Sequence, residues 1–493
     1  PRSTPKPSSA ASDVYKRQSV IRDKVVKRLR ERSIWVGTLY PPIHRLFSKQ
    51  SDANFKDSFY AHKHIINFIV EPSVLEREPL SITIQIAKGV IKKERVVLLL
   101  GGSHFYAPAI KHIHEMGMKV LLVDRDPEPI GKRFADYFEN INIVDATNVK
   151  RVAKAYDVDA VMAVNDYGVM TASKVSQALG LIGNPEEVAL ATTVKSVMRE
   201  RWKEAGVPIP KFRIVKSLKE AIFAVDEIGG YPVILKPSGN MGASRGVRKV
   251  SSVEELKAAF KLSAMYDQSI LVEEYLVGSE HSVEGLVYDG EVEIIAVSEK
   301  IKTPEPYRVD LAVIYPSSLT NEQLKQVEAA VIAAAKSLGI KNGAIHAEVC
   351  YTAQGPKLFE IASRPGGGRI PSDCVPLHNG VDMTKELVKV LLGISPSIKK
   401  RYFRGVVLGF IIAKPGVVVD ISECERLNKL PFVHVCESLK RVGDRVGPVR
   451  AGGDRAGYFI VTGKTRDEAL SHYFELSEMD IIKTKQVGES YGV

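Results

Sequence analysis

Residues 358–369 read Leu358-Phe-Glu360-Ile-Ala-Ser-Arg364-Pro-Gly-Gly-Gly-Arg369, and a second segment about a dozen residues earlier reads Ala344-Ile-His346-Ala-Glu348-Val. Each segment is apolar enough for a β-strand and carries one carboxylate, Glu348 or Glu360. A buried carboxylate is costly unless a cation or a strong donor compensates it. Two acids that share a divalent metal, with an arginine beside them, suit the handling of a nucleoside triphosphate. The alternative at this stage is a pair of unrelated surface acids on neighbouring strands.

Length and charge limit the class of protein. The chain has 493 residues, of which 45% are hydrophobic and 26% are charged, which is typical of a soluble globular protein with roughly two to four domains. Its net charge of +11 would suggest a nucleic-acid or membrane partner. However, residues 1–95 contain 19 Lys and Arg against 9 Asp and Glu, so the excess belongs to this N-terminal part. We therefore expect neither nucleic acid nor membrane as a partner.

The cysteines and the apolar runs indicate a location. Cysteines stand at 350, 374, 424 and 436, form no CxxC pair and read as buried or incidental thiols. The richest apolar run, 405–419, is interrupted by Lys414-Pro-Gly416 and is shorter than the roughly 20 residues that span a bilayer. These patterns predict a cytoplasmic protein.

Residues 1–94 are expected to lie apart from the rest. Residues 1–18, rich in Ser, Pro and Ala, read as an artefactual linker, and the true chain is expected to begin further upstream. In residues 19–94, the order Ile34-Trp-Val-Gly37, Tyr40-Pro-Pro-Ile-His44 and Ile65-Ile-Asn-Phe-Ile-Val70 resembles the C-terminal end of sugar-modifying (DegT-like) pyridoxal-phosphate aminotransferases. The resemblance implies an aminotransferase fused upstream in the natural protein. It predicts no transaminase activity here, because the lysine that holds pyridoxal phosphate in that family lies upstream of this region.

An open α/β domain is expected over residues 95–190. Continuous apolar runs predict buried parallel strands at 96–102, 120–124 and 160–164, with a helix at 107–116. The glycines at 101 and 102 are not followed by the later glycines of G-x-G-x-x-G. Tight turns are therefore favoured over a dinucleotide site.

Two further regions follow this domain. A basic helix is expected within 192–210, and strands dominate after it, with amphipathic helices at 319–338 and 383–392. From residue 401 to residue 493, short strands and glycine turns predict a small β-rich lobe closed by a helix that starts at Thr465.

Two lysines have the surroundings of a phosphate site. Lys195 opens the basic helix, although a single helix lysine is most often a solvated charge. The apolar strand 231–237 delivers Lys236 into a loop that contains Gly242, Ser244 and Gly246. Backbone amides of such small residues can approach phosphate oxygens, and the lysine adds a point charge. The alternative is a flexible hairpin turn.

A third motif suits a nucleoside. The strand that ends in Glu273-Glu274-Tyr-Leu276 can offer backbone groups to an adenine edge. Glu280 and His281 follow beyond a glycine turn, where Glu280 could accept a hydrogen bond from a ribose hydroxyl. Considered alone, the segment is an amphipathic strand pair.

In this order the motifs resemble those of the ATP-grasp superfamily, over about residues 96–475. The resemblance implies an α/β and α+β fold: a pre-ATP-grasp open α/β domain (95–190), a two-lobed ATP-grasp domain (191–277 and 278–400) and a β-rich C-terminal lobe (401–493). It implies ATP and Mg²⁺ or Mn²⁺ as cofactors, with Glu348 and Glu360 as metal ligands. The implied nucleotide-binding residues are Lys195, Lys236, Gly242, Ser244, Gly246, Glu273, Glu274, Leu276, Glu280 and His281.

One position departs from the family pattern. Many members carry an asparagine two residues after the second metal-binding glutamate, as a further metal ligand, whereas this chain has Ala362. Alanine cannot coordinate a metal, so a second ion would lose a ligand or take water instead. The number of metal ions therefore stays open.

Within the superfamily, the segments around His346, Arg364 and Ala456-Gly-Tyr-Phe-Ile-Val-Thr-Gly463 most resemble carboxylate–amine ligases of the L-amino-acid ligase kind. The resemblance implies that ATP and a carboxylate form an acyl phosphate, which an amine attacks, with release of ADP and phosphate. Lys236, Arg364 and Arg369 are the implied catalytic residues. Arg369 could clamp a substrate carboxylate, with a solvent-facing turn charge as the alternative.

Other functions stay open from the sequence. One alternative is a carboxylase or formyl-transferring relative, biotin-carboxylase-like or purine-biosynthetic. Another is a non-catalytic ATP-binding protein, which the missing asparagine motivates. The carboxylate and amine substrates are expected to be small molecules, and a homodimer is a further expectation.

Overall fold

The computed structural model describes residues 94–239, 246–305 and 307–486. The predictions for the linker, for the aminotransferase-like fragment and for Gly242 and Ser244 lie outside the described residues. Within the described part, no helix is both long enough and apolar enough to cross a membrane.

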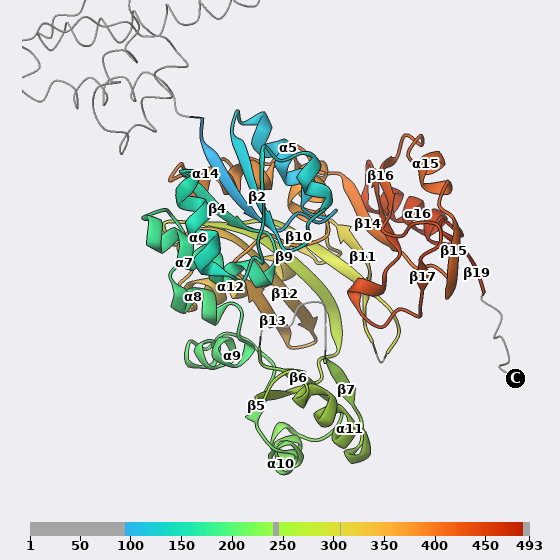
Figure 1. Cartoon of the computed structure of the whole chain (residues 1–493). Coiled ribbons are helices and arrows are strands. Elements are labelled where there is room, and N and C mark those ends of the chain that lie inside the picture. The colour runs from blue at the N-terminus through green and yellow to red at the C-terminus, as the bar shows by residue number, and fades with distance from the viewer. Residues whose placement is uncertain (1–93, 240–245, 306, 487–493) are drawn as a thin grey trace, which may run out of the picture. The chain divides into compact units, whose positions relative to one another are not determined.

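The first sheet is parallel, with the strand order β3-β2-β1-β4. Two of its strands, β2 and β4, are labelled in Figure 1. Its central strand β1 is buried along its whole length, because alternate residues pack into two different cores on the two faces of the sheet. The elements are β1 Val96–Leu100, β2 Lys119–Asp124, β3 Tyr137–Asn140, β4 Ala160–Ala163, α5 Ala107–Glu115, the 3₁₀ turn η3 Ile130–Arg133, α6 Ala146–Ala155 and α7 Asp166–Leu179. The sequence did not predict β3, since this edge strand has no buried residue and no apolar run.

The second sheet is antiparallel and small, with the order β5-β8-β6-β7. Helices α10 and α11 bury their apolar residues against it, in a core of its own. The elements from this region are α8 Glu186–Ala191, α9 Lys195–Glu204, β5 Phe212–Val215, α10 Leu218–Ile228, β6 Val233–Pro237, β7 Arg248–Val250, α11 Val253–Ala264 and β8 Ile270–Glu274.

The largest sheet has eight strands in the order β13-β12-β9-β10-β11-β14-β18-β16, and its neighbouring strands are antiparallel. Its last three strands come from beyond residue 401, so the β-rich C-terminal region continues this sheet. Strand β14 makes the junction, and every one of its residues is buried between β11 and β18. The strands are β9 Gly278–Tyr288, β10 Glu291–Lys302, β11 Asp310–Tyr315, β12 Gly343–Thr352, β13 Gly355–Ala362, β14 Gly405–Ile411, β16 Val433–Ser438 and β18 Gly457–Gly463.

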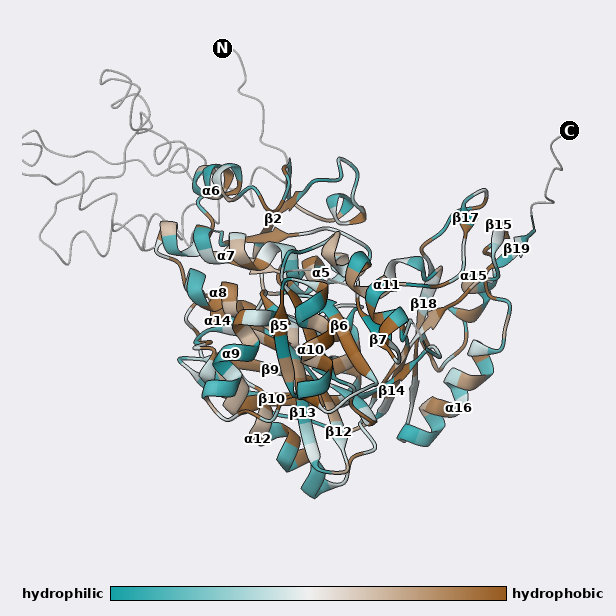
Figure 2. Cartoon of the chain, turned by 90° about the horizontal axis from the view of Figure 1, so that it is seen from below, coloured by the Kyte–Doolittle hydropathy of each residue, from teal (hydrophilic) through white to brown (hydrophobic). Residues whose placement is uncertain are grey.

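The remaining elements cover the large sheet or extend the C-terminal part. In Figure 2 the helices around the sheets, such as α10, α12 and α16, carry both hydrophilic and hydrophobic residues. The fold class expected from the sequence, α/β followed by α+β, is confirmed. These elements are α12 Asn321–Ser337, the π-helical turn η4 Ile370–Cys374, α13 Val375–Asn379, α14 Met383–Leu391, α15 Glu423–Leu427, the 3₁₀ turn η5 Gly452–Asp454, α16 Arg466–Ser477 and a small sheet of β17 Arg445–Val446, β15 Gly416–Asp420 and β19 Lys483–Lys485.

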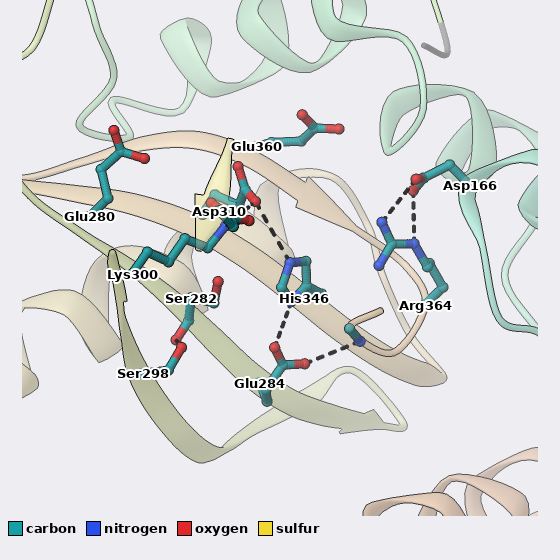
Figure 3. A network of polar contacts seen from close by, with 12 residues as sticks. Asp166, Glu280, Ser282, Glu284, Ser298, Lys300, Asp310, His346, Glu360 and Arg364 are labelled. Atoms are coloured by element: carbon teal, nitrogen blue, oxygen red, sulfur yellow. Dashed lines mark hydrogen bonds and ion pairs between the residues drawn. The ribbon is translucent and has the colours of Figure 1, made fainter. Parts of the chain in front are cut away.

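A buried ion pair lies inside the large sheet (Figure 3). Glu284 on β9 is completely buried and lies opposite His346 on β12, whose Nδ1 is 2.5 Å from the Glu284 Oε1. The same carboxylate accepts a hydrogen bond from the Gly366 amide at 3.2 Å. Burial opposes the charged imidazole, but the attraction of Glu284 and its hydrogen bond outweigh burial and raise the pKa of His346 to about 9.

This pair predicts that the protein loses stability at alkaline pH. The folded-state pKa of His346 lies above the ordinary value of 6.5, so the pair contributes fully below about pH 6.5 and its contribution is lost as the pH rises through about 9. The loss should be on the order of 3 kcal/mol, since each pKa unit corresponds to about 1.4 kcal/mol. Denaturant unfolding at pH 6 and pH 9 should show this decrease in the original chain and a much smaller one in Glu284→Gln.

His378 offers a matched control for that measurement. It is also a buried histidine, but its Nδ1 faces the Arg404 carbonyl at 2.7 Å and burial lowers its pKa. His378→Gln should therefore keep the decrease in unfolding free energy between pH 6 and pH 9. An equal decrease in Glu284→Gln would show that other groups cause the pH dependence.

Candidate active site

Two glutamates face each other across neighbouring strands. Glu348 on β12 pairs in register with Glu360 on β13, next to a bulge that makes Phe359 an extra residue in β13. Side chains directly opposite on an antiparallel pair lie on the same face with Cβ atoms about 5 Å apart, and like charges there repel. The side chains of Glu348 and Glu360 are 34% and 31% exposed. A cation must therefore compensate this pair from the open side.

Two lysines from other segments supply positive charge. The Lys300 ammonium, on β10, contacts Glu348 and lies 3.6 Å from Asp310. Burial opposes its charge, but these two carboxylates outweigh burial and raise the pKa of Lys300. Lys195, the first residue of α9, places its Nζ 3.3 Å from Glu360. The sequence prediction included Lys195 and missed Lys300, although alternation in Glu299-Lys-Ile-Lys302 puts two lysines on one face of the strand.

Glu273 holds a second pair of cations. It is buried on β8, with Lys236 Nζ at 2.6 Å and Arg199 Nε at 2.7 Å from its two oxygens. Burial opposes the ionised form, but the two cations outweigh it and lower the pKa of Glu273. Arg199 also donates to the carbonyl of the bulged residue Phe359 at 2.5 Å. Glu273 therefore fixes the position of Lys236. Through Arg199, it also links the small sheet to β13.

The acids predicted near the nucleoside have basic partners. Glu274 is bound by Lys357, 2.9 Å away, and accepts from the Lys211 amide at 3.1 Å. Glu280 is contacted by Lys302 and, at 2.5 Å, by Arg308. Both acids therefore carry their charge beside a cation rather than alone.

Arg364 is bound by an acid from the parallel-sheet domain. Its Nε and Nη2 donate to the two carboxylate oxygens of Asp166 at 2.8 and 2.9 Å (Figure 3). Such a bidentate pair fixes the guanidinium plane as well as its charge. Asp166 is the first residue of α7, just after strand β4, so its position follows the rule that ligand-side loops lie at strand C-termini.

Most of the residues described above line one cavity of about 270 Å³. A second cavity of about 410 Å³ adjoins it and shares Glu280, Lys302 and Arg308. The residues that the sequence predicted and that line the first cavity are Lys195, Lys236, Glu273, Glu274, Leu276, Glu280, Glu348, Glu360 and Arg364. Residues from three parts of the chain that are distant in sequence therefore meet at one site.

Three predicted residues within the described ranges do not line this cavity: Gly246, His281 and Arg369. His281 is completely buried, with Nε2 2.7 Å from Ser279 Oγ and Nδ1 3.0 Å from Ser317 Oγ. Strand alternation turns His281 away from the face that carries Glu280. This placement corrects the expectation that His281 contacts the nucleotide.

Arg369 does not line either of these two cavities. Its Nε and Nη2 donate to Asp373 at 2.9 Å, and its Nη1 donates to the Tyr458 hydroxyl at 3.0 Å. Neither the expected carboxylate clamp nor a solvent-facing charge describes this arrangement, because the guanidinium is already occupied within the fold. Gly246 follows residues 240–245, which lie outside the described residues, and has φ +74, a conformation that favours glycine.

The facing carboxylates suit a hard divalent cation. Mg²⁺ is usually held by one or two carboxylates together with substrate phosphates, and Glu348 with Glu360 supplies such a donor set. Ala362 lines the same cavity and offers no donor. Over the described ranges, no group of three or more His, Cys, Asp or Glu side chains is arranged to hold a metal. The residues present therefore fit a metal that shares its coordination with a bound phosphate.

Two regions of this chain match known domain families, and longer parts of it align with individual proteins. Residues 229–373 match the ATP-grasp domain, and residues 409–478 match the L-amino acid ligase C-terminal domain 2. The uncharacterized protein y4rH of Sinorhizobium fredii is 26% identical over 376 residues, which are 73% of this chain and 77% of that protein. Alanine–anticapsin ligase of Bacillus subtilis is 30% identical over 269 residues, or 49% of this chain. That alignment spans 56% of the ligase.

A solved structure resembles this chain over 80% of its length. The L-amino acid ligase of Bacillus licheniformis has a TM-score of 0.69 and 19% sequence identity, with 80% of this chain and 100% of that chain covered. At this identity the likeness concerns the fold. The two matched regions by themselves indicate an ATP-grasp domain followed by an L-amino acid ligase C-terminal domain 2.

Proposed function

We propose that this protein is an ATP-dependent carboxylate–amine ligase. It phosphorylates a small carboxylate with ATP, and an amine attacks the acyl phosphate, so that ADP and phosphate are released. The observation that carries the proposal is the facing pair Glu348 and Glu360, with Lys195 and Arg364 around the same cavity and Lys300 in contact with Glu348. Such a set of charges suits a triphosphate and the transfer of its terminal phosphoryl group.

Each charged residue has a role that its contacts support. Lys195 and Lys236 would bind phosphate oxygens, with Glu273 holding Lys236 in place. Arg364, oriented by Asp166, would stabilise the charge that develops on the transferred phosphoryl group. Glu348 and Glu360 would hold Mg²⁺, which when bound screens the phosphate charges during transfer. The adjoining cavity beside Glu280 and Lys302 would take the ribose side of the nucleotide.

The relatives support the nature of the substrates. The C-terminal match is to a domain of L-amino acid ligases, and one relative is an alanine–anticapsin ligase. We therefore propose an amino acid or a similar small acid as the carboxylate and a second amino-bearing molecule as the amine. A cytoplasmic location and a homodimer accord with this proposal, and they stay predictions.

Turnover is the direct test. The purified full chain, given ATP, Mg²⁺ and pooled L-amino acids, should release ADP at a rate that depends on the amino acids. Glu360→Gln removes one of the two facing carboxylates and should lower that rate by about 100-fold or more. Glu291→Gln is a matched control, because Glu291 is an exposed strand glutamate whose partner is a surface lysine, Lys336, and it should stay within about two-fold of the original rate.

The same assay separates the alternatives. ADP release that depends on bicarbonate or formate alone would replace the ligase with a carboxylase or formyl-transferring enzyme. Binding of ATP without ADP release above background in the original chain would indicate a non-catalytic ATP-binding protein.

A double-mutant cycle tests the link between Asp166 and Arg364. If Asp166 acts by orienting Arg364, then Asp166→Asn and Arg364→Lys should each lower kcat by about 100-fold, while KM for ATP changes little. The double variant should be no slower than either single variant, because both changes remove one unit. ADP release over a range of ATP concentrations measures these values. Multiplied losses in the double variant would show that the two residues act independently.

A further inference from the structure

Two cysteines are in contact inside the C-terminal part of the chain. Cys424 lies on the short helix α15 and Cys436 on strand β16, and their sulfur atoms are 3.0 Å apart. Both side chains are buried. Cys350 and Cys374 are buried as well, but within the described ranges the Cys424–Cys436 pair is the one sulfur–sulfur contact. Proximity, rather than burial, therefore sets this pair apart.

Asn428 fixes the backbone around the pair. Its side-chain Oδ1 accepts from the Cys436 amide at 2.7 Å, and its Nδ2 donates to the Cys436 carbonyl at 2.9 Å. Its own amide donates to the Cys424 carbonyl at 3.0 Å. These three hydrogen bonds connect Asn428 to the backbone of both cysteines, and they therefore fix the separation between Cys424 and Cys436. A disulfide needs an S–S separation near 2.05 Å, so the sulfurs must approach by only about 1 Å.

The contact also makes the two thiols unequal. The Cys436 thiol donates a hydrogen bond to Cys424 Sγ. That hydrogen bond lowers the pKa of the Cys424 thiol and raises the pKa of the Cys436 thiol. A thiolate is the form that reacts with oxidants, so Cys424 is the sulfur that reacts first.

We propose that Cys424 and Cys436 are an oxidative modification site, at which a peroxide closes a reversible intramolecular disulfide. The Cys424 thiolate attacks one oxygen of hydrogen peroxide, the O–O bond breaks, and a sulfenic acid and hydroxide form; the proton that the Cys424 thiol released converts the hydroxide to water. Cys436 then attacks the Cys424 sulfur and displaces the hydroxyl group as a second water. Two thiols and one peroxide therefore give one disulfide and two waters. A dithiol such as dithiothreitol reverses the bond.

The strand that carries Cys436 gives the bond a structural consequence. Other residues of β16 contact other parts of the fold: Val435 packs into the core shared with the parallel sheet, His434 Nε2 is 2.8 Å from Asp373, and Glu437 contacts His104 after β1. On the Cys436 face, the strand packs against α15 in a separate core. A disulfide would therefore fix the strand that connects the C-terminal part to the parallel-sheet domain.

Peptide mapping tests the proposal on the full chain. After treatment with hydrogen peroxide, free thiols are alkylated under denaturing conditions and the chain is cut with trypsin. Arg426 and Lys429 lie between the two cysteines, so the bond links two separate tryptic peptides. We expect these peptides to be cross-linked with the loss of two hydrogens, two of the four cysteines to escape alkylation, and dithiothreitol to restore all four. Hydrogen exchange of the β16 amides should slow in the oxidised form.

Two cysteine variants show whether the bond forms specifically between Cys424 and Cys436. Cys424→Ala should retain three alkylated thiols after peroxide, whereas Cys350→Ala, which removes a buried cysteine outside the pair, should still lose two. Four free thiols in the oxidised original chain, a cross-link through Cys350 or Cys374, or addition of oxygen atoms without a cross-link would each overturn the proposal. Unchanged exchange across 433–438 in the cross-linked chain would overturn the claim that the bond fixes β16.

Discussion

Compensation of negative charge on one face of the large antiparallel sheet is the constraint on which the site depends. Glu348 and Glu360 lie opposite each other on β12 and β13, where like charges repel. The lysines that compensate them come from elsewhere, Lys300 from β10 and Lys195 from the start of α9. An unpaired charge in such a half-buried place is strongly unfavourable. The position of α9 against the sheet is therefore coupled to the chemistry of the two glutamates.

The same compensation joins the other parts of the chain to the cavity. Glu273 on the small sheet holds Lys236, and Asp166 from the parallel-sheet domain holds Arg364. In each pair, an acid fixes a cation in a position that faces the cavity. Under the proposed function, a triphosphate and a metal ion would enter a site in which the positive charges are already oriented. Preorganised charges of this kind lower the cost of reorganisation during a reaction.

The sequence predicted the elements that depend on local pattern and missed what depends on pairing between distant segments. The apolar runs around Val96 and Leu121 predicted buried strands, and the motif order grouped Lys195, Lys236, Glu348 and Glu360, which line one cavity. Lys300, Asp166 and Glu284 were not predicted, because each acquires its role from a partner at least 48 residues away. His281 was assigned to the nucleotide because its neighbour Glu280 was, although adjacent residues of a strand point to opposite faces. The sequence also did not predict that the large sheet continues through β14. The change in composition near residue 401 suggested a separate lobe, whereas β14 pairs with β11.

The two arginines of the opening motif show why proximity in sequence misleads here. Arg364 and Arg369 are five residues apart, yet the glycine turn between them sends their side chains to different partners. A Cβ on Gly366 would lie 2.8 Å from the buried Glu284 carboxylate, so only glycine lets the chain pass that close. Gly368 and Arg369 then adopt φ values of +67 and +66, which redirect the chain toward Asp373 and Tyr458. The buried Glu284 therefore shapes the turn that keeps Arg364 at the cavity and takes Arg369 away from it.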